Sequence, residues 1–180
     1  MGTRGLFGFY YKGKYYVIYN HWDSYPSGLG QEIVDQIKNA IASGNFEQWK
    51  IALETIIVVD DQIPPTEDDI KALEKYTNLS VSMQNTSDWY CLLRNCQGSL
   101  QAVIDAGYLI NSVDKDGVPF FEEYAYIVNY DTDCLDFYIG SKKKQSYCFE
   151  KLPNFSEVGE GSETDEDSET DEDNEDNKLY

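Results

Sequence analysis

The first apolar positions of the chain fall in two short runs rich in aromatic and β-branched residues, at 5–11 and 14–20. The Lys12-Gly13 pair between the runs favours a tight turn, so the two runs predict a β-hairpin. In the second run, apolar residues fill both alternating sets of positions. This pattern is typical of a strand covered on both faces, and we expect a central strand of the sheet there.

A helical period replaces the alternation from residue 29 onward. Apolar residues then recur every three or four positions in four segments, which are Leu29 to Gly44, Phe46 to Ile57, Thr66 to Tyr76 and Asp88 to Gly107. Thr66 and Asp69 have the spacing of a capping box, and Asp88 is of a type that caps helices. Gly98 weakens the middle of the fourth segment. We therefore expect about four helices.

Strand patterns return in the last third of the chain. Residues 108–113 predict a short strand, and residues 123–130 and 134–139 predict a second hairpin around the turn at 131–133. A final strand is expected at 146–150, after a loop that contains Lys142, Lys143 and Lys144.

This order of strands, helices and strands indicates an α+β fold, because helices and strands are segregated rather than alternating. We expect one antiparallel sheet, formed by the N-terminal hairpin and the C-terminal strands and packed with the helices. The composition changes after Phe155, from where the chain is almost entirely polar and acidic. The sequence therefore predicts a globular domain at 1–155 and a disordered acidic tail at 156–180, since such a segment buries too little apolar area to fold.

Charge is concentrated in that tail. The 180-residue chain has 14 basic and 33 acidic residues, a net charge of −19. Twelve of the acidic residues lie in the acidic tail with one basic residue, Lys178, which gives the tail −11 and leaves −8 for the rest. Because binding to a phosphate backbone needs clustered Lys and Arg, we expect no direct binding to nucleic acid, although an acidic protein that mimics nucleic acid stays open.

The acidic tail contains a tandem hexapeptide, Ser-Glu-Thr-Asp-Glu-Asp, at 162–167 and 168–173. Each copy places a hydroxyl three residues before an acid, the pattern preferred by kinases of the casein kinase 2 type. We expect phosphorylation at four hydroxyls, Ser162, Thr164, Ser168 and Thr170. Each phosphate adds about −1.5 to −2 charge, which favours a basic protein as partner. The alternative is a solubilising tail without a specific partner.

Candidate catalytic residues lie directly after the second run. His21, Asp23 and Ser24 combine an imidazole, a carboxylate and a hydroxyl at a strand end, and His21 is the one histidine of the chain. Neighbouring residues rarely form a triad, because its side chains converge from separate elements. The alternative is that His21 and Asp23 fix the loop by hydrogen bonds.

Four further residues are candidates for ligand binding. Gly28 and Gly30 precede a predicted helix, where backbone N–H groups bind anions, although no nucleotide-binding motif is completed and turn glycines are the alternative. Arg4 and Arg94 have apolar neighbours and are candidates for an anionic ligand or for a structural ion pair.

Metal and cofactor binding are not expected. The four cysteines lack the paired spacing of a zinc site, and without a leader peptide they are expected to be reduced core thiols. We also expect no membrane attachment and an intracellular location, because no stretch approaches the roughly 18 apolar residues of a spanning helix.

Three segments together resemble an uncharacterised protein family of fungi and large, mimivirus-like DNA viruses of amoebae. They are residues 1–9, 19–30 and 88–98, MGTRGLFGF, YNHWDSYPSGLG and DWYCLLRNCQG. The resemblance spans most of residues 1–150 and implies a viral or fungal protein, which in the viral case acts in the host cytoplasm or nucleus or is carried in the virion. It implies no activity.

The first of these segments also resembles, distantly, the start of class II glutamine amidotransferases, which are N-terminal-nucleophile hydrolases. That resemblance implies a fold in which sheets flank helices, and a nucleophile at the start of a strand. Those enzymes have Cys where this chain has Gly2, and Thr3 would become the nucleophile after removal of two residues.

The sequence therefore favours a non-enzymatic binding protein with a phosphorylatable, polyanionic tail. The alternative is a small hydrolase or amidotransferase-like enzyme with its site around His21, Asp23 and Ser24.

Overall fold

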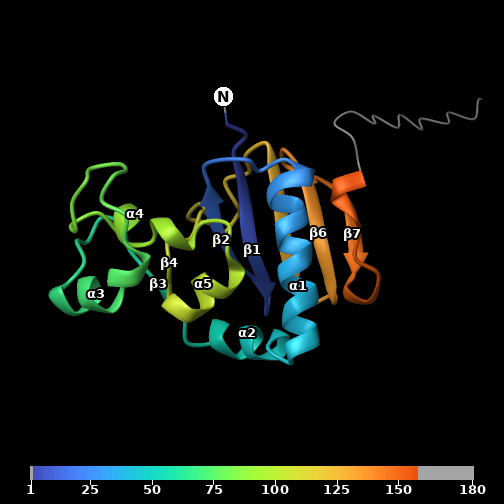
Figure 1. The fold of residues 1–180 in the computed structure, drawn as a ribbon, viewed down its shortest axis with the longest axis horizontal. Coiled ribbons are helices and arrows are strands. Elements are labelled where there is room, and N and C mark those ends of the chain that lie inside the picture. Colours follow the sequence, from blue (N-terminus) through green and yellow to red (C-terminus); the bar gives the residue numbers. More distant parts are fainter. Residues whose placement is uncertain (1, 158–180) are drawn as a thin grey trace, which may run out of the picture.

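The computed structural model describes residues 2–157, and its centre is a mixed five-stranded sheet (Figure 1). The strand order is β2-β1-β5-β6-β7. The strands are β1 (Gly5–Tyr11), β2 (Lys14–Asn20), β5 (Tyr124–Asn129), β6 (Cys134–Ile139) and β7 (Lys142–Cys148). Both predicted hairpins and the α+β class are confirmed, and the sheet joins strands from both ends of the domain.

The prediction of a fully antiparallel sheet is wrong at one pair. Strands β1 and β5 are parallel, whereas the other three pairs of the sheet are antiparallel. Gly5, at the start of β1, lies opposite both Asn20 and Tyr124. The helical block therefore leaves β2 and returns to β5 at the same end of the sheet, so that β5 runs in the direction of β1.

Along the chain, five α-helices and a parallel two-stranded sheet follow the first hairpin and precede the second. In Figure 1, α3, α4 and the small sheet lie to one side of the five-stranded sheet. The helices are α1 (Gln31–Ser43), α2 (Phe46–Leu53), α3 (Glu67–Ala72), α4 (Trp89–Leu92) and α5 (Leu100–Ala106). The small sheet pairs β3 (Ile57–Val58) with β4 (Tyr108–Leu109). The predicted second helix is therefore too long, because Ile57 belongs to a strand. The capping box of Thr66 and Asp69 at the start of α3 is confirmed.

The predicted fourth helix is three short helices. Helix α4 is followed by the 3₁₀-helix η3 (Arg94–Cys96), and α5 starts again after Ser99. Gly98 has a φ of +80°, a conformation that ends a right-handed helix. The Ser99 side chain then accepts a hydrogen bond from the Ala102 N–H as a new N-cap.

Lys142, Lys143 and Lys144, which the sequence placed in a loop, begin strand β7. The turn before them needs two residues, because Gly140 adopts a φ of +56° and reverses the chain at once. Strand β7 is an edge strand, and lysines on an edge discourage pairing with another chain.

The sheet is covered on both faces. On one face, α1 packs over β1, β5 and β6 through a cluster that includes Phe7, Phe9, Ile33, Ile37, Tyr126 and Leu135 (Figure 1). On the other face, a smaller cluster contains Leu6, Val17, Ala125, Ile127 and Tyr138, with Val113 and Phe121 packed against it. The segment between β4 and β5 supplies those last two residues and is the second cover.

Strand β2 lies at the edge of the sheet, not at its centre as its sequence predicted. The Asn111 side chain accepts a hydrogen bond from the Val17 N–H at 2.9 Å and donates one to the Tyr15 carbonyl at 2.8 Å. The Ser112 N–H donates to the Val17 carbonyl at 2.8 Å. The apolar pattern of β2 has another cause, because Tyr16 and Ile18 pack against the cluster on one face and Tyr15, Val17 and Tyr19 belong to the cluster on the other.

Candidate functional site

The loop after β2 turns around the side chain of Asn20, which is buried at the end of the strand. Asn20 Nδ2 donates hydrogen bonds to the Trp22 carbonyl and to Ser24 Oγ, the latter at 2.9 Å. The Ser24 N–H donates to the Thr3 carbonyl at 3.1 Å, which ties the loop to the segment before β1. This network fixes the main chain of the loop that carries His21, Asp23 and Ser24.

Ser24 points into the protein. The residue is 0% exposed, and its carbonyl accepts a hydrogen bond from the Tyr126 hydroxyl at 3.0 Å. A Cβ on Gly5 would lie 2.6 Å from Ser24 Cβ, so the serine packs directly on the first strand. The hydroxyl of Ser24 therefore has a structural role in the loop, and no substrate reaches it in this conformation.

Asp23 and Thr3 are placed apart from Ser24 Oγ. Asp23 is exposed, with a φ of +54°, and its carbonyl accepts a hydrogen bond from the Leu29 N–H. Thr3 is half-buried and contacts Ser24 through its main-chain carbonyl. The loop therefore does not bring the predicted catalytic residues together as a triad.

His21 lines a surface hollow of about 420 Å³. Its Nδ1 lies 2.8 Å from the Tyr19 hydroxyl, and its ring meets the Trp22 ring edge to face. The hollow is lined by Gly2, Arg4, His21, Trp22, Glu122 and Glu123. Since Tyr19 holds one ring nitrogen, the imidazole is fixed in direction beside one cation and two carboxylates.

Arg4, a predicted ligand-binding residue, also lines this hollow. The residue is exposed. Its main-chain N–H donates a hydrogen bond to Glu123 Oε1 at 3.1 Å. Arg94 is half-buried on η3 and is not among the residues that line the hollow. Burial raises the pKa of the Tyr19 phenol, while the positive charges of Arg4 and Arg94 act in the opposite direction. The charges of both arginines therefore act on the tyrosine that orients His21.

In the Gly28 and Gly30 loop, the N–H groups of both glycines are hydrogen-bonded within the protein. The loop forms η1 (Pro26–Gly30), in which the N–H groups of Gly28 and Gly30 both donate to the Tyr25 carbonyl. Gly30 is buried against the Tyr126 ring, from which a Cβ would lie 2.7 Å. Close packing therefore explains both glycines, and the anion site stays a prediction.

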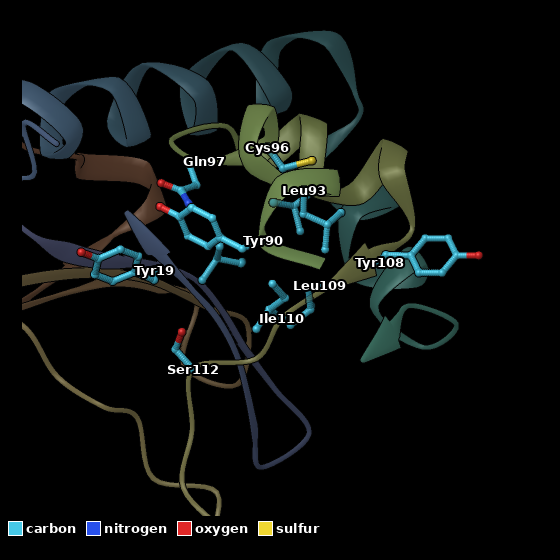
Figure 2. Close-up of a pocket in the computed structure, with 11 residues that line it drawn as sticks. Tyr19, Tyr90, Leu93, Cys96, Gln97, Tyr108, Leu109, Ile110 and Ser112 are labelled. Atoms are coloured by element: carbon cyan, nitrogen blue, oxygen red, sulfur yellow. The ribbon is translucent and has the colours of Figure 1, made fainter. Parts of the chain in front are cut away.

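A second, smaller cavity of about 70 Å³ lies between β2 and the α4–α5 region. Figure 2 shows Tyr19 entering its wall from β2, Tyr90 and Gln97 from the α4–η3 segment, and Ser112 from the segment after β4. The remaining lining is largely apolar and consists of Ile18, Leu93, Cys96, Val103, Tyr108, Leu109 and Ile110. Burial raises the pKa of the Cys96 thiol to about 12, so this cysteine is a packing residue.

The sequence did not identify Tyr19, Gln97 or Glu123 as site residues. Gln97 Oε1 accepts a hydrogen bond from the main-chain N–H of His21 at 3.3 Å, although the two residues are far apart in the chain. These side chains come from three separate segments of the fold. No local motif joins them, so a signal would have to come from the tertiary structure.

No group of three His, Cys, Asp or Glu side chains within residues 2–157 is arranged to hold a metal ion. Among the described helices, none has the length and apolar character to cross a membrane. Ser162, Thr164, Ser168 and Thr170 lie outside the described residues. Ser156 and Glu157, predicted as the first residues of the tail, belong to the short helix η5 (Phe155–Glu157).

No family model, curated protein or solved structure matches the chain. The resemblances to a fungal and viral family and to class II glutamine amidotransferases therefore stay predictions.

Proposed function

We propose that this protein is a non-catalytic binding protein whose acidic tail binds basic proteins. The observation that carries the proposal is the charge of the tail, where twelve acidic residues stand against one basic residue. Such a density of like charge attracts a partner with clustered lysines or arginines and repels acidic surfaces. Phosphorylation of Ser162, Thr164, Ser168 and Thr170 would strengthen the attraction.

The structure supports this proposal by the way the domain anchors the start of the tail. Phe155 is buried, and its ring packs against the rings of Tyr126, Phe137 and Tyr147. One residue later, the Ser156 N–H donates a hydrogen bond to Gln31 Oε1 at 3.2 Å. Phe155 and Ser156, which directly precede the acidic residues in the sequence, are therefore fixed to the domain.

The buried position of Ser24 supports the non-catalytic part of the proposal. Its hydroxyl is engaged with Asn20 and is separated from the hollow that His21 lines. A serine nucleophile needs an accessible hydroxyl within hydrogen-bond distance of its base, and this pair lacks that arrangement.

The test is the affinity of the full chain for a synthetic lysine-rich peptide, measured by fluorescence anisotropy. In one variant, six tail acids become amides, namely Asp165, Glu166, Asp167, Asp171, Glu172 and Asp173. In the matched control, six exposed acids of the domain become amides, namely Asp60, Asp61, Glu67, Asp68, Glu74 and Asp116.

Because each exposed ion pair contributes about 0.2–1 kcal/mol, we expect the tail variant to bind at least about tenfold more weakly than the unmodified chain. The control should stay close to the unmodified chain. Equal losses in both variants would contradict a specific role of the tail.

A hydrolase or amidotransferase-like activity is the second candidate, and the hollow at His21 favours it. Tyr19 orients the imidazole, and Arg4 stands in the same hollow to neutralise a developing negative charge. For an enzyme of this kind, His21→Gln would reduce hydrolysis of a model ester or of glutamine by about 100-fold. Equal rates of hydrolysis for the unmodified protein and for His21→Gln would remove this candidate.

A further inference from the structure

Two cysteines face each other across the last hairpin. Cys134 on β6 and Cys148 on β7 are directly opposite in the register, and their Sγ atoms are 3.7 Å apart. Both are free thiols in the structure. The sequence predicted reduced core thiols. Cys134 is buried, with 9% of its surface exposed, whereas Cys148 is exposed.

The hydrogen-bond pattern identifies the kind of pair that they form. The Phe149 N–H donates to the Asp133 carbonyl at 3.2 Å, so the adjacent pair of residues is a hydrogen-bonded one. Pairs alternate along an antiparallel ladder, and Cys134 and Cys148 are therefore a non-hydrogen-bonded pair. Such pairs bring the Cα atoms to about 4.5 Å, within the range of about 4.4–6.8 Å that a disulfide spans.

The two thiols differ in accessibility. The Cys134 thiol donates a hydrogen bond to the Thr132 carbonyl, and burial raises the pKa of this thiol. Cys148 faces solvent on the edge strand, where a reagent reaches it. We therefore expect Cys148 to react first with the reagent. Cys134, the neighbouring buried thiol, reacts second, with Cys148.

The other two cysteines lack such a partner within the described residues. Cys91 is buried, and its thiol donates to the Val81 carbonyl. Cys96 is buried in the wall of the small cavity, with its thiol directed to the Ala102 carbonyl. Disulfide chemistry is therefore confined to the β6–β7 pair.

We propose that Cys134 and Cys148 form a thiol–disulfide exchange site that reacts with a small soluble disulfide of the glutathione class. The Cys148 thiolate attacks one sulfur of the reagent, the S–S bond of the reagent breaks, and one thiol leaves with the proton that Cys148 lost. The Cys134 thiolate then attacks Cys148 Sγ in the mixed disulfide and releases the second thiol, which takes the proton of Cys134. Two electrons pass from the cysteine pair to the reagent, which is reduced to two thiols.

The product would link the edge strand covalently to its neighbour. Strand β7 continues into η4 (Phe149–Lys151) and then reaches Phe155, the residue that anchors the tail. Oxidation would therefore add a covalent link to the contacts that already hold the base of the acidic tail, and reduction would remove that link.

The experiment exposes the reduced full chain to glutathione disulfide and follows its intact mass with time. We expect a transient adduct of one glutathione, and then a product lighter than the starting chain by two hydrogen atoms. Proteolytic mapping of the non-reduced product should give one linked pair of peptides, containing Cys134 and Cys148.

Two variants separate the steps. Cys134→Ser should stop at the glutathione adduct, and Cys148→Ser should form neither the adduct nor the linked product. Cys91→Ser is the matched control and should react like the unmodified chain. A stable adduct on the unmodified chain, or a link that involves Cys91 or Cys96, would overturn the proposal without reliance on any variant.

Discussion

The side chain of Asn111 forms hydrogen bonds with main-chain groups on the open edge of β2. A further strand of the sheet would form similar bonds there. Its amide accepts from the Val17 N–H and donates to the Tyr15 carbonyl, and Val17 itself is fully buried. Nothing in the sequence marks this asparagine, since the segment around it carries a weak strand pattern. Both faces of β2 pack against apolar clusters, so its pattern resembles that of a central strand, and Asn111 pairs the main-chain groups that its edge position leaves open.

Replacing Asn111 by Ala should lower the free energy of unfolding by about 1–3 kcal/mol, because it leaves a donor and an acceptor of β2 without partners. Urea unfolding followed by circular dichroism measures this difference. The control is Asn45→Ala, at an exposed asparagine that makes no side-chain capping bond. A loss no larger than that of the control would contradict the pairing role of Asn111.

Single residues of the candidate site were predicted only in part. His21 and Arg4 share a hollow, but Ser24 is buried and Asp23 turns away with its positive φ. Residue types and their adjacency suggested chemistry there, whereas the direction of each side chain depends on Asn20 and on contacts to Thr3 and Tyr126. Those contacts come from distant parts of the chain, which a local pattern does not contain.

Among the elements, the hairpins and α1 follow closely from the sequence. Turn residues and periodicity are local signals, and Gly44 ends α1 in the left-handed conformation as its position predicts. The segment at 88–107 departs from its pattern, because Gly98 interrupts a run whose apolar spacing is helical throughout. A glycine inside a helical period is compatible both with a weakened helix and with a break.

A weakened helix and a break predict changes of opposite sign in the free energy of unfolding for Gly98→Ala. In a continuous helix, this change would stabilise the protein by up to about 1 kcal/mol. At a φ of +80°, we expect it to destabilise the protein by about 1–2 kcal/mol, since a Cβ would meet neighbours at ordinary contact distances and the backbone conformation alone is penalised.

Thermal and urea unfolding of Gly98→Ala measure the sign. Gly98→Asn is the matched control, because asparagine tolerates the left-handed conformation better and should cost less than alanine. Stabilisation by alanine would contradict the break between η3 and α5.

For the whole molecule, the α+β class and the joining of both chain ends in one sheet were predictable, because helices and strands fall in separate blocks. The parallel pairing of β1 and β5 was not, since it depends on where the helical block returns to the sheet. The two covers of the sheet, α1 and the segment between β4 and β5, are likewise products of the tertiary fold.

The central claim concerns the division of roles between a folded domain and an acidic tail. Its most direct test is the salt dependence of the affinity for the lysine-rich peptide, measured between about 0.05 and 0.3 M salt, where screening of exposed charges changes strongly. The six substitutions in the tail reduce its net charge from −11 to −5.

If the tail binds the peptide, the logarithm of Kd for the unmodified chain should rise steeply with the logarithm of the salt concentration. The slope for the tail variant should be roughly half as large, because about half of the interacting charge is gone. The variant with six neutralised acids on the domain should keep the full slope. Equal slopes for the unmodified chain and the tail variant would contradict the account.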